Sequence, residues 1–187
     1  VGYPDLLAVA EDARGQGALT VTPLQLAYAT GGLVMGGVWH TPHLVKQARP
    51  AGSPRLVQLN ADYAAEIVNA LFGVVNDGGT GARARIPGVE VCGKTGTAQL
   101  ASNAALKSAK LAEALKDNAW FVGFAPRHNP EIVVVALYEA GEHGHLAAPI
   151  VRDVIKAYFD KQRPRRTPEV LAAKGPAEGA LPGGSRN

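Results

Sequence analysis

Three short segments rich in β-branched and aromatic residues constrain the fold most, because turn-forming residues bound each of them. They span residues 89–97, 119–125 and 131–139, which are lengths typical of β-strands. Residues 126–130 alone connect the second segment to the third, and so short a connection favours an antiparallel hairpin. The sequence therefore predicts an antiparallel sheet.

Helix signals surround these segments. Thr22-Pro23 is a typical helix start, since threonine caps free amides and proline suits the first turn. A second helix is predicted behind Asn60, with a buried apolar stripe at helical spacing, formed by Ala64, Ile67, Val68, Leu71, Phe72 and Val75. A third is predicted to open at Ala148-Pro149 and to lie across the sheet, with an apolar face of Ile150, Val151, Val154, Ile155, Tyr158 and Phe159. A short exposed helix is expected within residues 98–118.

The predicted fold class is therefore α/β of the α+β type, with helices packed on an antiparallel sheet. One unit is expected over residues 1–160. The net charge of +3 resides in residues 161–187, which hold six Lys or Arg against two Glu together with many Pro and Gly. We expect a disordered basic tail there, and no nucleic-acid partner.

Other features of the composition narrow the class of protein. One cysteine excludes an internal disulfide, and no apolar run is long enough to span a membrane. Cys92 is expected to be a small buried residue, and Trp120 and Phe124 are expected to fill the core. Trp39 is expected in a turn, without a role. Because the chain starts with Val1 instead of methionine, it is interpreted as mature, trimmed or a fragment.

Two patterns compete for the stretch around Lys94. Residues 88–95 match the spacing of a phosphate-binding loop. That loop requires an apolar strand before it and a helix beginning at the lysine, whereas residues 89–92 are strand-like and Gly96 would weaken such a helix. The second pattern is the Lys-Thr-Gly box of penicillin-binding proteins and β-lactamases, which lies on a strand. The strand context favours the box.

On a strand, Lys94 and Gly96 point to the face opposite Thr95 and Thr97. Glycine leaves room for a substrate backbone, the lysine supplies positive charge for a carboxylate, and the amide of Thr97 faces a developing oxyanion. Two histidines in His143-Gly144-His145 resemble a metal pair, but no third ligand stands at a recognisable spacing. We interpret them as a loop after the strand, and expect no metal and no cofactor.

Several further motifs accompany the box, in the order typical of one family. They are Gly15-Gln16-Gly17, residues 19–27, Gly78-Gly79-Thr80-Gly81, residues 93–99, residues 119–126 and Ala147-Ala148-Pro149. In these the chain resembles the C-terminal part of a class B penicillin-binding protein transpeptidase domain, and the elongation-type members more than the division-type ones. The resemblance implies a penicillin-binding transpeptidase/β-lactamase-like fold with an incomplete N-terminal half.

The resemblance also implies a function. It is that of a peptidoglycan D,D-transpeptidase that cross-links D-Ala-D-Ala stem peptides through a serine acyl-enzyme and is inhibited by β-lactams. Lys94 and Thr97 would be catalytic, and Thr95, Gly96 and Thr97 would bind substrate. The expected location is the periplasmic side of the inner membrane, through an N-terminal anchor outside this chain, beside a membrane glycosyltransferase.

The family's nucleophile motif is missing from these residues. No serine has a lysine three positions later, and the one Ser-x-Asn match, Ser185-Arg186-Asn187, follows the box instead of preceding it. The chain is therefore interpreted as lacking its nucleophile-bearing segment and inactive alone. Alternatives are a D,D-carboxypeptidase or β-lactamase-like serine hydrolase, a non-catalytic scaffold and, third, a nucleotide binder. Without its upstream part, the chain is expected to expose apolar helix faces.

Overall fold

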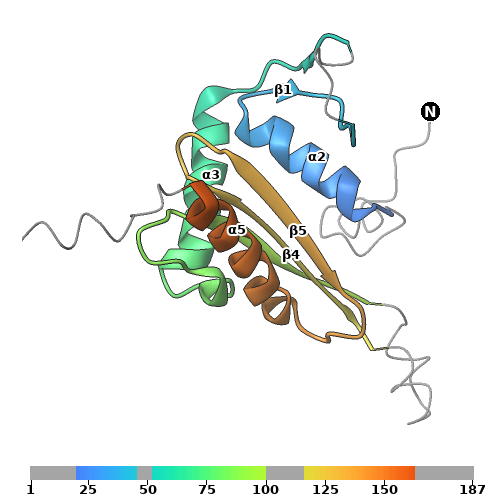
Figure 1. Cartoon of the computed structure of the whole chain (residues 1–187), viewed down its shortest axis with the longest axis vertical. Coiled ribbons are helices and arrows are strands. Elements are labelled where there is room, and N and C mark those ends of the chain that lie inside the picture. The colour runs from blue at the N-terminus through green and yellow to red at the C-terminus, as the bar shows by residue number, and fades with distance from the viewer. Residues whose placement is uncertain (1–19, 46–51, 100–115, 163–187) are drawn as a thin grey trace, which may run out of the picture.

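The computed structural model describes residues 20–45, 52–99 and 116–162 (Figure 1). Its main sheet has three antiparallel strands in the order β3-β4-β5. Their bounds are Cys92–Ala98 for β3, Asn118–Ala125 for β4 and Ile132–Tyr138 for β5. The predicted hairpin is confirmed. The first strand begins later than expected, because residues 86–89 form a tight turn with a single bridge between Ile86 and Val89.

Helices α2 and α3 begin where their capping residues predict, and α5 begins at the predicted Ala148. Helix α2, Pro23–Val34, starts with a capping box in which Thr22 and Gln25 each satisfy the other's backbone amide. Helix α3, Ala61–Asn76, starts at Asn60, whose side chain accepts from Tyr63 N at 3.1 Å. Helix α5, Ala148–Gln162, follows the short 3-10 turn η2, Gly144–Leu146.

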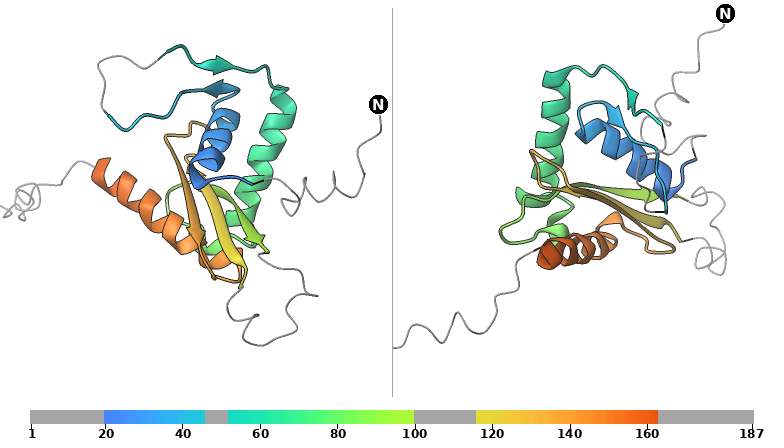
Figure 2. Two further views of the ribbon diagram at one scale, coloured as in Figure 1. Left: turned by 90° about the vertical axis from the view of Figure 1, so that its right-hand side faces the viewer. Right: turned by 45° about the horizontal axis from the view of Figure 1, so that its top comes forward.

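The sheet lies between α5 on one face and α2 on the other (Figure 2). Close packing of α5 is possible because β4 carries Gly123, where an added Cβ would stand 2.8 Å from Val151. Helix α3 contacts β3 and the 3-10 turn η1, Ala82–Ala84. Its end is tied to the entry of β3 by Asn76, whose side chain donates to Val91 O at 2.8 Å. Helix α3 therefore holds the entry of β3 in place.

Strand β4 contributes aromatic residues to both faces of the sheet. Phe121 and Phe124 are fully buried, while Trp120 is half-buried. The prediction for Phe124 is confirmed and that for Trp120 is wrong: alternation puts both on the face of β4 opposite Phe121, and on that face Phe124 is buried while Trp120 stays half-buried. Burial of a side chain such as Phe121 stabilises the fold by about 1.5–3 kcal/mol. The core also contains Val75, Val91, Val151 and Ile155.

The apolar helix faces are less buried than their periodicity predicts. Ile67 of α3 is 42% exposed, and Ile150 and Val154 of α5 are each 46% exposed. Spacing identifies a face but not its width: α5 buries Ala148, Val151 and Ile155 and packs the partly buried Phe159 against the same core, while Ile150 and Val154 at the sides of this face stay exposed. Leu24 on α2 is exposed as well. The expectation of exposed apolar helix surface is met on these elements.

Trp39 lies in a strand, not in the predicted turn. It belongs to β1, Val38–Trp39, which pairs antiparallel with β2, Arg55–Leu56. The indole lies on Gly32 of α2, where a Cβ would overlap ring atoms at 1.8 Å. Trp39 therefore packs the small sheet against the helix.

Two predictions lie outside the described residues. The basic tail of residues 161–187 falls there except for its first two positions, and so does most of the helix expected in residues 98–118. Within the described ranges, no helix combines the length and the apolar character needed to cross a bilayer.

Candidate active site

The Lys-Thr-Gly box lies in the middle of a regular strand. Residues 93–97 are all within β3 and pair with β4, Thr95 with Phe121 and Thr97 with Ala119. A phosphate-binding loop would need a helix beginning at Lys94, and the strand continues there instead. The nucleotide-binding alternative is therefore wrong.

A depression of about 340 Å³ opens beside this strand. Its lining comes from three separate parts of the chain: Thr80, Thr95, Thr97, His143, Gly144 and His145. The side chains of Thr95 and Thr97 enter from the same face of β3, as strand alternation predicts. The structure thus brings two of the predicted site residues into one pocket.

Thr80 reaches the pocket through a glycine turn after α3. Gly78 has φ +78°, a conformation that favours glycine, and Gly79 packs so closely on Val74 that a Cβ would stand 2.6 Å from its backbone. The turn places Thr80 Oγ1 2.8 Å from Thr95 Oγ1. Since one hydroxyl donates to the other, the pair holds both groups in fixed positions and leaves one hydrogen to direct elsewhere.

The turn η2 closes the opposite side of the pocket. Gly144 N donates to Thr97 Oγ1 at 3.2 Å. This contact requires glycine, because a Cβ at position 144 would lie 2.5 Å from the carbonyl oxygen of Gly96. Gly144 and the half-buried Gly96 therefore allow two backbone segments to touch, and this contact sets the position of the Thr97 hydroxyl.

Lys94 lies apart from this group. Its side chain is exposed, and Nζ donates to the carbonyl oxygen of Thr95 at 2.8 Å. It does not line the depression, because its position on β3 points to the other face, as alternation predicts. The ammonium group is therefore held along the strand, close to the box but not inside the pocket.

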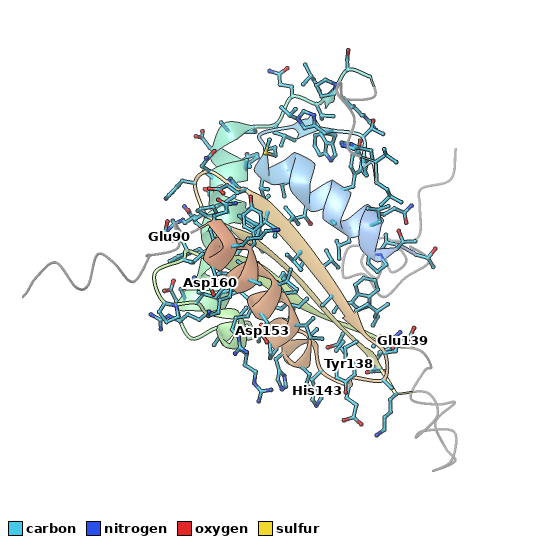
Figure 3. The ribbon with its side chains drawn as sticks, viewed as in Figure 1. Glu90, Tyr138, Glu139, His143, Asp153 and Asp160 are labelled. Atoms are coloured by element: carbon cyan, nitrogen blue, oxygen red, sulfur yellow. The ribbon has the colours of Figure 1, made fainter. Side chains whose placement is uncertain are left out.

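The two histidines lie side by side. Their rings are stacked, with centroids 5.6 Å apart and an angle of 20° between the planes. The loop interpretation is correct in that both residues flank the start of η2 after β5, with His143 exposed and His145 half-buried. Figure 3 shows His143 at the end of the sheet where Tyr138 and Glu139 lie. Among residues 20–45, 52–99 and 116–162, no cluster of three or more His, Cys, Asp or Glu is arranged to hold a metal.

Cys92 is a structural residue, as the sequence predicts. Its side chain is completely buried at the start of β3, and burial raises the pKa of the thiol from 9.0 to about 11. The charge of Arg127 lowers this pKa and that of Glu90 raises it, both less than burial. A thiol that stays protonated is a poor nucleophile.

Sequence reasoning missed part of the pocket. From the sequence, Thr80 is named only as part of the Gly-Gly-Thr-Gly motif, without a role in the site, and the two histidines are interpreted only as part of a loop. The histidine spacing across one glycine was visible in the sequence. Their place beside Thr95 and Thr97 was not, because it depends on how η2 packs against β3 and β4.

Comparison with known proteins agrees with this geometry. Residues 3–156 match the family model described as the penicillin binding protein transpeptidase domain. The Peptidoglycan D,D-transpeptidase MrdA of Acinetobacter baumannii is 34% identical over 92% of this chain and 28% of its own length. That of Haemophilus influenzae is 39% identical over 81% of this chain and 26% of its own length. The chain thus spans little more than a quarter of these relatives.

Solved structures show the same likeness. The crystal structure of PBPA from Mycobacterium tuberculosis is 28% identical and superposes with a TM-score of 0.66, over 83% of this chain and 38% of that one. The D,D-transpeptidase domain of a peptidoglycan glycosyltransferase from Eggerthella lenta is 32% identical, with a TM-score of 0.60 over 76% of this chain and 33% of that one. With a family model matched over most of its residues and a fold shared with these structures, the chain belongs to the penicillin-binding protein transpeptidase domain family.

Proposed function

We propose that this chain forms the β3 wall of a D,D-transpeptidase active site, in a protein that cross-links peptidoglycan stem peptides through a serine acyl-enzyme. The observation that carries the proposal is the group of three hydroxyls, Thr80, Thr95 and Thr97, beside a strand at the edge of the described sheet. The MrdA relatives bear the name of that activity.

The three threonine hydroxyls are suited to binding a carboxylate. A stem peptide that ends in D-Ala-D-Ala, like a penicillin, presents one carboxylate next to the carbonyl that is attacked. Hydroxyl donors that the fold already holds in place bind such an anion without further ordering cost. Thr95 is held by Thr80 at 2.8 Å and Thr97 by Gly144 at 3.2 Å. We assign substrate binding to Thr95, Gly96 and Thr97, with Thr80 as a positioning residue.

The strand also suits the peptide backbone. Within the described residues β3 is paired on one side only, with β4, so an extended substrate can add along its other edge. Gly96 carries no side chain to obstruct that approach. The amide of Thr97 is assigned to the oxyanion, where a fixed donor stabilises the charge that forms when the serine attacks.

The remaining chemistry is assigned to residues outside this chain. The serine attacks the carbonyl of the penultimate D-alanine, the terminal D-alanine leaves, and an amine of a neighbouring stem then takes the acyl group and frees the serine. No Ser-x-x-Lys stands in these 187 residues, so we place the nucleophile and its lysine in a different segment of the protein. Lys94 supplies positive potential and engages the hydroxyl of the family's Ser-x-Asn motif.

Location and partners follow from this assignment. Stem peptides are cross-linked outside the inner membrane, so we place the protein on its periplasmic side, anchored by a helix outside this chain. As an elongation-type member it would work beside a membrane glycosyltransferase that supplies uncross-linked glycan. β-Lactams would acylate the same serine.

Acylation by a fluorescent penicillin tests the proposal. Intact mass is read on two samples, the 187-residue chain and the product of the complete reading frame. We expect an adduct only on the longer product, on a serine outside this chain, and slower acylation in its Lys94→Ala variant. A normal rate in that variant would remove Lys94 from the site. Release of D-alanine without cross-links would instead indicate a carboxypeptidase.

A non-catalytic scaffold is the second candidate, favoured by the missing serine motif. It predicts no adduct on either sample, although the complete protein remains folded. Retention of the complete protein on peptidoglycan without acylation would support this candidate against the enzyme.

A further inference from the structure

We propose that His143 and His145 complete the carboxylate-binding pocket and strengthen its hold on anionic ligands as the pH falls. The inference rests on the proposed function, since it assigns the pocket to the carboxylate of a stem peptide or a β-lactam. It adds two substrate-binding side chains from outside the Lys-Thr-Gly box.

The position of the two imidazole rings is the first argument for this proposal. Both imidazoles line the same depression as the hydroxyls of Thr80, Thr95 and Thr97. His143 is the residue before η2 and His145 lies within it, and Gly144 between them donates to Thr97 Oγ1 and lies directly on Gly96. The histidines therefore cannot move away from β3 as a free loop end would, because the glycine between them is locked to the strand.

The charge of the pocket lining is the second argument. Lys94 is turned away from the depression, so none of the described residues that line it has a permanent charge. Hydroxyls offer a carboxylate neutral donors, and a charged donor adds the Coulombic attraction of a cation to the hydrogen bond. Imidazole is the side chain that gains charge between about pH 8 and pH 5. Its protonation would give the lining a cation.

Two of the neighbouring carboxylates are already paired with a cation. The elements packed against η2 are β3, β4 and α5. Strand β3 contributes Lys94, β4 has no charged residue, and the first turns of α5 contribute Arg152 and Asp153, which pair with each other at 2.8 Å. In the loop before η2, Glu142 pairs with Lys116 at 3.3 Å, and Glu139 lies at the end of β5. The nearby carboxylates of Asp153 and Glu142 thus already have cationic partners, whereas the structure gives no ion pair to Glu139 within the described residues.

The stacked arrangement favours an anion over a metal. Rings that lie nearly parallel with centroids 5.6 Å apart do not converge their in-plane lone pairs on one point, as a tetrahedral metal requires. A carboxylate, in contrast, has two oxygens and accepts from donors on different sides. The chemical class assigned to the pocket is therefore a carboxylate-terminated peptide or its lactam mimic.

The test compares acylation rates of the complete protein between pH 5.5 and 8. Its variants are His143→Gln, His145→Gln and the double variant, and His128→Gln is the matched control, because His128 is exposed in the turn between β4 and β5. The probes are benzylpenicillin and its methyl ester, which lacks the carboxylate charge. Thermal melting checks that each variant folds, and the exposed His143 provides a mild substitution.

We expect the ratio of wild-type to double-variant rates with benzylpenicillin to rise about 5-fold from pH 8 to pH 5.5, and His128→Gln to match wild type throughout. With the ester the ratio should stay flat. If the wild type is acylated but the ratio with benzylpenicillin stays flat, the role of the histidines is refuted while the proposed function is not. An equal rise with the ester would also refute that role, since the carboxylate would then be irrelevant. No adduct on wild type would refute the proposed function itself.

Discussion

Replacing Gly144 by alanine tests whether the contact between η2 and β3 shapes the pocket. The added Cβ would lie 2.5 Å from Gly96 O, 2.8 Å from Gly96 N and 3.0 Å from Gly96 C. All three are backbone atoms, so no side chain can rotate away. To reach an ordinary contact of 3.4 Å, the turn must move by roughly 0.9 Å, and such overpacking costs about 1–3 kcal/mol.

That movement has a functional consequence. It stretches the hydrogen bond from Gly144 N to Thr97 Oγ1, now 3.2 Å, and a shift of about 1 Å in a binding group can slow a reaction about 100-fold. We therefore expect Gly144→Ala in the complete protein to lower the rate of penicillin acylation by about 10-fold to 100-fold. The assay is stopped-flow or gel-based labelling with a fluorescent penicillin.

Gly31→Ala is the control for this prediction. Position 31 is inside α2, and nothing lies within 4 Å of its added Cβ. Alanine there should stabilise the helix by about 0.5–1 kcal/mol and leave acylation unchanged. Wild-type acylation in Gly144→Ala would refute the reasoning, because the contact would then not set the geometry of Thr97.

Two further predictions concern stability. The pKa of Cys92 is raised by burial from 9.0 to about 11, so above pH 9 the unfolded thiol loses its proton while the folded one keeps it, and stability falls. At pH 10 wild type should have lost roughly 1 kcal/mol relative to its value at pH 8, beyond any loss in Cys92→Ala. Urea unfolding at both pH values measures this, and an equal loss in the two proteins would count against it. Thr22→Ala removes the capping box of α2 and should cost about 1 kcal/mol in the same assay, whereas Thr41→Ala, in an exposed loop, should cost almost nothing.

Local signals predicted most of the fold. The caps at Thr22 and Asn60 and the five residues between the last two strands placed both helix starts and the hairpin within a residue or two. These features act over a few residues, so the sequence contains them directly. The prediction of buried side chains failed where burial depends on packing between elements that are distant in the sequence. Ile67 and Ile150 have helical spacing but remain exposed, because spacing does not say how wide a surface meets them.

The candidate site, too, was predicted from the sequence only in part. Alternation along one strand predicted that Thr95 and Thr97 share a face and that Lys94 does not. Thr80 and His145 reach the pocket by turns whose packing involves Val74 and Gly96. Nothing in the spacing of these segments along the chain reveals that contact. The residues that sequence reasoning missed are thus those brought to β3 from other elements.

The most direct measurement of the central claim is a crystal structure of the complete protein acylated by benzylpenicillin. Our account predicts the penicillin carboxylate within about 3 Å of the hydroxyls of Thr95 and Thr97, with the acylated serine on a segment outside this chain. A carboxylate bound elsewhere, with the pocket beside β3 filled only by solvent, would contradict it.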